Sequence, residues 1–428
     1  MKLSFWQVIM IPLLVGLVLS WVLFSESEAE IEATISAAQA LSGGDTEGYI
    51  QALGPREFVF PGDHGAHPGF KTEWWYYTGN LFTEEGKQFG YQFTIFRNQL
   101  SPSVAGNVSS LPQDNDQQTS QAGSTDPAQI KPDDSVRINP EAEGAQNSVW
   151  NTNQLYLAHF AISDVSKKEH VFDERYSRGA AGLAGASVDP YQIWLEDWEI
   201  TRVKDSEASD ERFPVRIKAE MSNGTALDVV LNPLKPLVLQ GEEGYDKKGS
   251  EDGNASFYIS FTRMQTEGIL QKDGESLVVS GLSWMDHEWS TSALDSGQTG
   301  WDWFSIQLSN GYELMYYQIR NTDPELVPQT TGSLVAPNGQ KRDLDQGEVH
   351  LDVLEYWTSP YTGARYPVQW ILAIPSEELE IDVATVFDDQ EMTVSVQYYE
   401  GALQVTGKFR DKAIKGNGYI EMTGYEQD

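Results

Sequence analysis

Short runs in which apolar and polar residues alternate fill most of the chain, and this pattern restricts the possible folds most strongly. In the run FGYQFTIF, residues 89–96, large apolar side chains recur at every second position, so one face of an extended strand would be apolar. Similar runs continue to the C-terminus, separated by turn residues, without a long helical period. The sequence therefore predicts an all-β, mostly antiparallel protein built as a barrel or a sandwich.

A weak internal repeat indicates that the same β unit occurs twice. EWWYYTGNL (73–81) aligns with GWDWFSIQL (300–308), and each is followed by a strand that ends in Arg-Asn, at Arg97 and at Arg320. Two related β-barrels in tandem would explain the repeat. The alternative is a chance similarity of two aromatic hairpins, because strand propensity alone favours these residues.

One long stretch does not follow the strand pattern. Residues 101–149 are rich in Ser, Gln, Asp, Gly and Pro and nearly free of aromatic residues, which is typical of a disordered insertion in a hairpin loop. A functional lid is the alternative. We therefore expect a first barrel over residues 55–292, including this insertion, and a second barrel over residues 293–428.

The N-terminus carries an export signal. Residues 5–24 are uncharged and long enough to span a bilayer of about 30 Å. Lys2 precedes them and acidic residues follow, which places the rest of the chain across the membrane. Residues 1–24 are thus expected to be a cleaved signal peptide or an N-terminal membrane anchor, and residues 25–54 a helical stalk or linker with a helix over 28–43. The predicted location is periplasmic or otherwise extracytoplasmic, with membrane contact only through residues 5–24.

Charge and cysteine content exclude several functions. The formal net charge of −35 repels nucleic acid, so no nucleic-acid partner is expected. The absence of cysteine excludes disulfides, thiolate catalysis and cysteine-ligated metals. Asp63, His64 and His67 could form a metal clip, but a loop flanked by Pro and Gly lacks the rigid support that metal ligands need. We predict no metal site and no cofactor.

The segment SWMDHEWS (283–290) is the strongest candidate for a site, because it places charged residues between tryptophans. On a strand, Asp286 and Glu288 face one way while His287 and Trp289 face the other. A carboxyl group in an aromatic interior would have a raised pKa and could act as a general acid near neutral pH. The alternative is a structural Asp-His rim that ties two barrels together.

The hairpin after this segment mixes aromatic and polar side chains. Trp301 and Trp303 share a face of one strand, and Tyr316, Gln318 and Arg320 share a face of the next. Such a mixture suits a cavity for an apolar ligand with one polar point, and the aromatic faces could stabilise a developing carbocation. Ordinary core packing is the alternative.

Several motifs resemble the AttH/CrtC family, a group of lipocalin-like proteins that contains carotenoid 1,2-hydratase and many secreted hydrolases assigned by sequence. The motifs are FPGDHGAHPGFKTEWWYYTGNL, LVLQGEEGYDKKG, GLSWMDHEWSTSAL with the GWDWFSIQLSNGYELMYYQIR that follows, and GNGYIEMTGY. The resemblance runs from about Arg56 to Tyr425, apart from the insertion, and is stronger to the secreted-hydrolase branch. It implies two consecutive lipocalin-like (calycin) antiparallel β-barrels after the N-terminal hydrophobic helix.

The resemblance also implies a type of chemistry. In the hydratases, an acid protonates an isoprenoid double bond, aromatic groups stabilise the cation, and water adds. His287, Trp289 and Tyr316 match positions implicated in that reaction, whereas Gln318 stands where the family has an aspartate. Because glutamine cannot deliver a proton as a carboxylic acid can, Asp286 or Glu288 would have to supply it.

We therefore expect an exported protein that acts on, or binds, a hydrophobic small molecule or lipid. The first hypothesis is a hydrolase or hydro-lyase. The alternative is a non-catalytic carrier or envelope chaperone that works with a transporter. The catalytic candidates are Asp286, His287, Glu288 and Tyr316, and the ligand-binding candidates are Trp289, Trp301, Trp303, Gln318 and Arg320.

Overall fold

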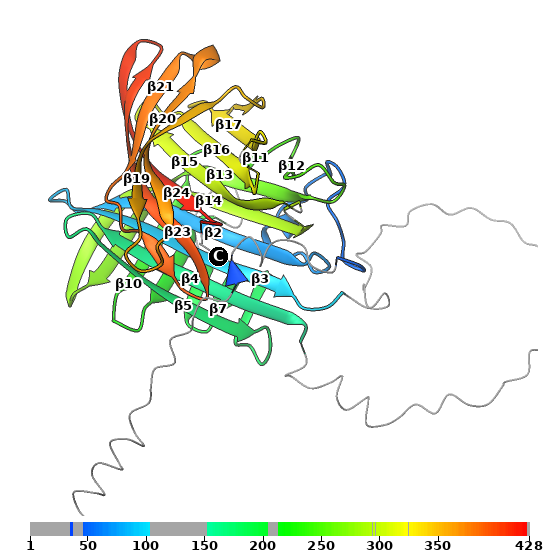
Figure 1. Cartoon of the computed structure of the whole chain (residues 1–428). Helices are drawn as coiled ribbons and strands as arrows, with labels where there is room; N and C mark the ends of the chain where they lie inside the picture. The colour runs from blue at the N-terminus through cyan, green and yellow to red at the C-terminus, as the bar shows by residue number, and fades with distance from the viewer. Residues whose placement is uncertain are drawn as a thin grey trace, which may run out of the picture.

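The computed structural model describes residues 35–36, 46–102, 152–203, 213–292, 294–295, 297–323 and 325–425. Throughout these residues the chain forms β-strands, turns and two short 3-10 helices, η1 (Gly62–His64) and η2 (Pro375–Glu377), with no α-helix. The strands build two curled antiparallel sheets that pack against each other (Figure 1). The prediction of an all-β fold is confirmed.

The first sheet has 13 strands and is formed by residues 72–292. In Figure 1 it is the light blue to yellow-green part of the molecule. Its strands in spatial order are β5 (Glu169–Arg178), β4 (Gln154–Asp164), β3 (Gln88–Gln99), β2 (Thr72–Phe82), β14 (Glu275–Ser292), β13 (Ala255–Lys272), β10 (Ala226–Pro233), β9 (Val215–Glu220), β8 (Trp198–Arg202), β7 (Tyr191–Leu195) and β6 (Ala184–Val188), while β11 (Val238–Leu239) and β12 (Tyr245–Lys247) also pair with β13.

The second sheet has 11 strands, most of them from residues 298–422. It is coloured yellow to red in Figure 1. Its strands in spatial order are β18 (Lys341–Leu344), β17 (Gln329–Val335), β16 (Glu313–Asn321), β15 (Gln298–Leu308), β24 (Lys412–Met422), β23 (Val396–Phe409), β21 (Leu379–Thr385), β20 (Arg365–Ile374) and β19 (His350–Thr358), while β1 (Ile35–Ser36) and β22 (Glu391–Thr393) pair with β23.

The central strands of the first sheet are buried on both faces. Trp75 and Tyr77 of β2 point into the core enclosed by the first sheet, whereas Trp74 and Tyr76 point toward the second sheet. Because side chains alternate along a strand, the four consecutive aromatic residues of β2 serve two different cores.

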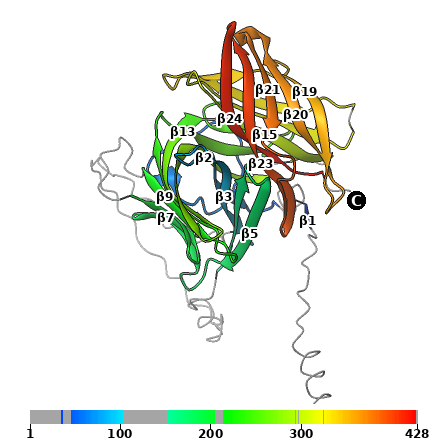
Figure 2. The same cartoon turned by 90° about the vertical axis from the view of Figure 1, so that its left-hand side faces the viewer.

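Polar side chains join the two sheets across their contact. The Tyr76 hydroxyl donates to Glu400 Oε2 at 2.8 Å, and Asn80 Nδ2 donates to the carbonyl oxygen of Gly418 at 3.0 Å. In Figure 2, β23 extends down from the second sheet and runs beside the first one, where it contacts β3 and β4. The two sheets therefore enclose a shared interface.

Part of the N-terminal prediction is wrong and part cannot be compared with the structure. Ile35 and Ser36 lie within the helix expected over 28–43, but they are extended and pair in parallel with Val396 and Gln397 of β23. The rest of that helix, the hydrophobic segment 5–24 and nearly all of the insertion at 101–149 lie outside the described residues. Within the described ranges, no helix is long and apolar enough to cross a membrane.

Candidate functional site

A cavity of about 120 Å³ lies between the two sheets. Strands β2, β3, β4, β13 and β14 of the first sheet contribute side chains to it, as do β15, β16, β23 and β24 of the second. Its walls are mostly apolar because the strand faces that meet here carry aromatic side chains. The aromatic lining residues are Trp74, Tyr76, Phe96, Tyr258, Trp301, Trp303, Tyr317 and Tyr398.

Asp286 on β14 is a buried carboxyl group in this cavity, with only 3% of its surface exposed. The Tyr258 hydroxyl donates to Oδ2 at 2.6 Å, while the Ser260 hydroxyl and Trp284 Nε1 donate to Oδ1 at 2.6 and 2.7 Å. Burial raises the pKa of Asp286 to about 7, although the three hydrogen bonds oppose this rise. At neutral pH, Asp286 can therefore both give and accept a proton.

Glu288 also lines the cavity but is paired with a lysine. Lys248 Nζ lies 2.8 Å from Glu288 Oε1 and 2.9 Å from Asp246 Oδ2, and it sits 4.4 Å from the centre of the Tyr317 ring. Burial raises the pKa of Glu288, and the nearby ammonium group of Lys248 works against this rise. Lys248 thus pairs with two carboxyl groups, those of Glu288 and Asp246.

Two further carboxyl groups lie on the side of the second sheet. Glu421 accepts a hydrogen bond from Trp301 Nε1 at 3.0 Å, and burial raises the pKa of Glu421 to about 8. Glu400, the partner of Tyr76, has a pKa well above its usual range, first because of burial and then because of Glu421. The cavity therefore combines apolar walls with carboxyl groups that hold protons near neutral pH.

His287 and Trp289 point to the opposite face of β14, away from the cavity. His287 Nε2 donates to Glu73 Oε1 at 2.8 Å, and burial lowers the pKa of His287 to about 4. Trp289 stacks on the ring of His67, with 3.7 Å between the ring centres. His287 is thus a neutral hydrogen-bond donor and makes no contact with Asp286.

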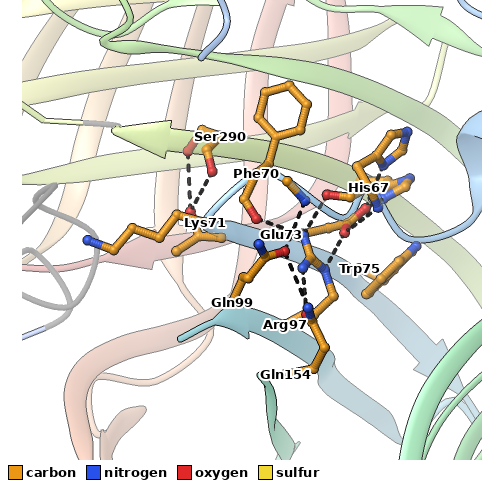
Figure 3. Close-up of polar contacts among 12 residues, drawn as sticks. His67, Phe70, Lys71, Glu73, Trp75, Arg97, Gln99, Gln154 and Ser290 are labelled. Carbon is orange, nitrogen blue, oxygen red and sulfur yellow. Dashed lines mark hydrogen bonds and ion pairs between the residues drawn. The ribbon is translucent and has the colours of Figure 1, made fainter. Parts of the chain in front are cut away.

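Glu73 is the centre of a buried charge network on this face. Figure 3 shows Glu73 between His67 and Arg97, with His67 Nδ1 2.7 Å from Oε1 and Arg97 Nε 2.7 Å from Oε2. Burial alone would raise the pKa of Glu73, but His67, His287 and Arg97 together hold it well below its usual range.

His67, Glu73 and His287 could in principle hold a metal ion, because their nitrogen and oxygen atoms lie within 4.8 Å of one another. These atoms already form hydrogen bonds with each other, however, and Arg97 neutralises Glu73. Both oxygen atoms of Glu73 are therefore already paired, whereas His287 Nδ1 is buried without a hydrogen-bond partner among the described residues. In the candidate metal clip at residues 63–67, Asp63 Oδ1 lies 3.0 Å from His67 Nε2. The His64 ring packs on Phe60 instead.

Tyr316, Gln318 and Arg320 do not line the cavity. Tyr316 packs against Phe304 in the core of the second sheet, and Gln318 and Arg320 bind the carboxyl group of Asp302. Their neighbours on the other face of β16, Tyr317 and Ile319, line the cavity instead. Of the nine residues predicted for the site, the structure brings four together in the cavity: Asp286, Glu288, Trp301 and Trp303.

Sequence reasoning missed several polar residues of the cavity. Lys248 and Glu421 lie within the motifs GYDKKG and GNGYIEMTGY, so the motifs pointed to the segments without singling out these residues. Tyr258 lies directly opposite Glu288 in the β13–β14 pairing, and its hydroxyl reaches the neighbouring Asp286. Tyr258 and Lys248 belong to the first sheet, as Asp286 and Glu288 do, whereas Glu421 joins them only through the packing of the second sheet.

Comparisons with known proteins identify the family. A family model described as AttH-like matches residues 51–131 and 134–425. Kievitone hydratase from Fusarium solani subsp. phaseoli is 25% identical over 173 residues, which are 37% of this chain and 46% of that protein. Dehydratase asqC from Emericella nidulans is 21% identical over 226 residues, which are 50% of this chain and 62% of that protein. The matches thus span less than two thirds of either relative.

Solved structures share the whole architecture. A structure assigned to AttH from Nitrosomonas europaea has a TM-score of 0.67 and 29% identity, and the match covers 88% of this chain and 99% of that one. Kievitone hydratase from Nectria haematococca has a TM-score of 0.60 at 13% identity over 90% and 98% of the two chains, a likeness of fold alone. The lipocalin-like fold implied by the sequence motifs is thereby confirmed, and the chain belongs to the AttH-like family.

Proposed function

We propose that this protein is a hydro-lyase, which adds water to, or removes it from, a small apolar molecule bound between the two sheets. The observation that carries the proposal is Asp286, a buried acid with a pKa of about 7 in an aromatic cavity. An acid that is half protonated at neutral pH is well suited to general acid–base catalysis. The names of the two curated relatives, a hydratase and a dehydratase, support the same class of reaction.

The geometry suggests how the hydration reaction and the dehydration reaction would each proceed. In hydration, Asp286 gives its proton to one carbon of a double bond, and the faces of Trp301 and Trp303 stabilise the positive charge on the other carbon. Water then adds to that carbon and loses a proton to the Asp286 carboxylate, so the acid is restored. In dehydration, Asp286 protonates the leaving hydroxyl group, which departs as water, and a base of the cavity takes up the proton released when the double bond forms.

A carrier of apolar molecules is the second candidate, because the same aromatic cavity would hold a ligand without any chemistry. The Asp286→Asn variant separates the two functions, since asparagine keeps the shape of aspartate but cannot donate a carboxyl proton. An enzyme with this variant should bind its ligand and lose turnover by about 100-fold or more. A carrier should tolerate Asp286→Asn and lose affinity in Trp303→Ala.

The experiment is a turnover assay on a panel of prenylated phenols, isoprenoid alkenes and their alcohols in ¹⁸O-labelled water. Mass spectrometry would detect the gain or loss of one labelled water. Asp228→Asn is the matched control, because Asp228 is an exposed partner of Arg216 and does not line the cavity. Binding by the wild-type protein without any incorporation of label across the panel would favour the carrier.

We further propose that the protein works outside the cytoplasm, either anchored or released. The uncharged segment 5–24 with Lys2 before it supports this location. Fractionation of the cells that produce the full chain, followed by N-terminal sequencing, tests the proposal: an intact N-terminus in the soluble cytoplasmic fraction would contradict it.

A further inference from the structure

A second polar group lines the cavity at the edge formed by β4 and β23. Tyr398 Oη lies 2.5 Å from His159 Nδ1, and His159 Nε2 lies 3.0 Å from Glu174 Oε2. Tyr398 comes from the second sheet, whereas His159 and Glu174 come from neighbouring strands of the first. Tyr398 and His159 are only 4% and 1% exposed, and both line the cavity.

In a neutral His159 ring, the hydrogen-bond partners determine which nitrogen carries the proton. Glu174 also accepts hydrogen bonds from the hydroxyl and backbone N–H groups of Ser395. Burial would raise the pKa of Glu174, but His159 and Ser395 hold it below its usual range, so it is a carboxylate. The carboxylate accepts from His159 Nε2–H, which leaves Nδ1 as the acceptor for the Tyr398 hydroxyl.

The hydroxyl group of Tyr398 donates to a different kind of acceptor than the hydroxyl groups of the other three tyrosines that line the cavity. Their hydroxyl groups donate to carboxyl groups: Tyr76 to Glu400, Tyr258 to Asp286 and Tyr317 to Asp246. The Tyr398 hydroxyl donates instead to an imidazole nitrogen that is in turn oriented by a carboxylate. A hydroxyl group, a histidine base and an orienting carboxylate form the arrangement that activates hydroxyl groups in many enzymes.

We propose that Tyr398 is a catalytic residue of this cavity, with His159 as its base and Glu174 as a positioning residue. The reaction that it serves rests on the proposed hydro-lyase function. In dehydration, Tyr398 Oη takes a proton from substrate carbon while its own hydroxyl proton moves to His159 Nδ1. The electron pair of the broken C–H bond forms the double bond. The leaving hydroxyl group takes the proton of Asp286 or Glu421 and departs as water.

The relay can be tested without knowing the substrate, by labelling the intact protein with benzenesulfonyl fluoride. This apolar reagent forms an O–S bond with an activated tyrosine and releases fluoride, and the phenolic proton would pass to His159 Nδ1. Peptide mass spectrometry then gives the labelling rate of each tyrosine in the cavity. Burial raises the pKa of all four hydroxyl groups well above the usual range, so their rates depend on the base beside each one. We expect Tyr398 to react about tenfold or more faster than Tyr76, Tyr258 and Tyr317, and His159→Gln to remove that advantage.

His170→Gln is the matched control, because His170 is a half-buried histidine of the first sheet that bonds to Ser163 and does not line the cavity. It should leave the labelling of Tyr398 unchanged. If the hydrogen bonds of Tyr398, His159 and Glu174 only held the two sheets together, the four tyrosines would react at similar rates. That result, measured on the wild-type protein, would overturn the proposal even if His159→Gln did not fold. Labelling is independent of turnover, so it stays informative if the hydro-lyase assay fails.

Discussion

At the scale of single residues, the environment of each carboxyl group determines its role. Asp286 is buried among hydroxyl and indole donors and keeps a proton up to about pH 7, whereas Glu73, buried on the other face of the same sheet, is held ionised by Arg97 and His67. The difference lies in the partners, since neutral donors compensate burial less well than cations do. Asp286 is therefore suited to exchange protons, and Glu73 to hold structure.

This contrast predicts that Glu73→Gln destabilises the protein strongly. The substitution leaves Arg97 buried without its anion, which typically costs about 3 kcal/mol or more of unfolding free energy. Urea denaturation would measure the loss. The control is Asp228→Asn, because the Asp228–Arg216 pair is exposed, and removing such a pair costs less than about 1 kcal/mol. Equal losses in the two variants would contradict a structural role for Glu73.

At the scale of the strands, β14 contributes side chains both to the cavity and to the buried charge network around Glu73. Because successive side chains of β14 point to opposite faces, Asp286 and Glu288 point to the cavity. His287 and Trp289 point to the side on which Glu73 lies. Its pairing with β2 is close, because a Cβ atom at Gly281 would lie only 2.0 Å from the carbonyl oxygen of Asn80.

Gly281→Ala should therefore push β2 away from β14 and lower the unfolding free energy by about 1–3 kcal/mol. The thermal midpoint of the variant would measure this effect. Gly54→Ala serves as the comparison, because a Cβ atom at Gly54 has no heavy atom within 4 Å. An unchanged midpoint in Gly281→Ala would mean that the two strands are less closely packed than described.

The strand pattern explains how far the site could be predicted from the sequence. The alternation correctly separated Asp286 and Glu288 from His287 and Trp289, and it correctly placed Trp301 with Trp303. It could not show which face of a strand meets the ligand when both faces are apolar. For this reason the strand pattern favours Tyr316, Gln318 and Arg320 as cavity residues, although the structure places Tyr317 and Ile319 there.

At the scale of the whole molecule, the site belongs to neither sheet alone. The all-β class and the doubled β unit could be read from alternation and from the repeat, since both depend on local sequence. The packing of one sheet on the other could not, because contacts such as Tyr76 with Glu400 and His159 with Tyr398 join residues more than two hundred positions apart. The cavity, and the place of Glu421 opposite Asp286 and Glu288, arise only from that packing.

The central claim is that Asp286 exchanges a proton inside this cavity at neutral pH. Infrared difference spectroscopy of the wild-type protein and Asp286→Asn would measure it, because a protonated carboxyl group has a carbonyl stretch that a carboxylate lacks. The raised pKa means that Asp286 is protonated below about pH 7, so its band should be present at acidic pH and disappear as the pH rises through about 7. A band that disappears near pH 4, as for an exposed aspartate, would contradict the account.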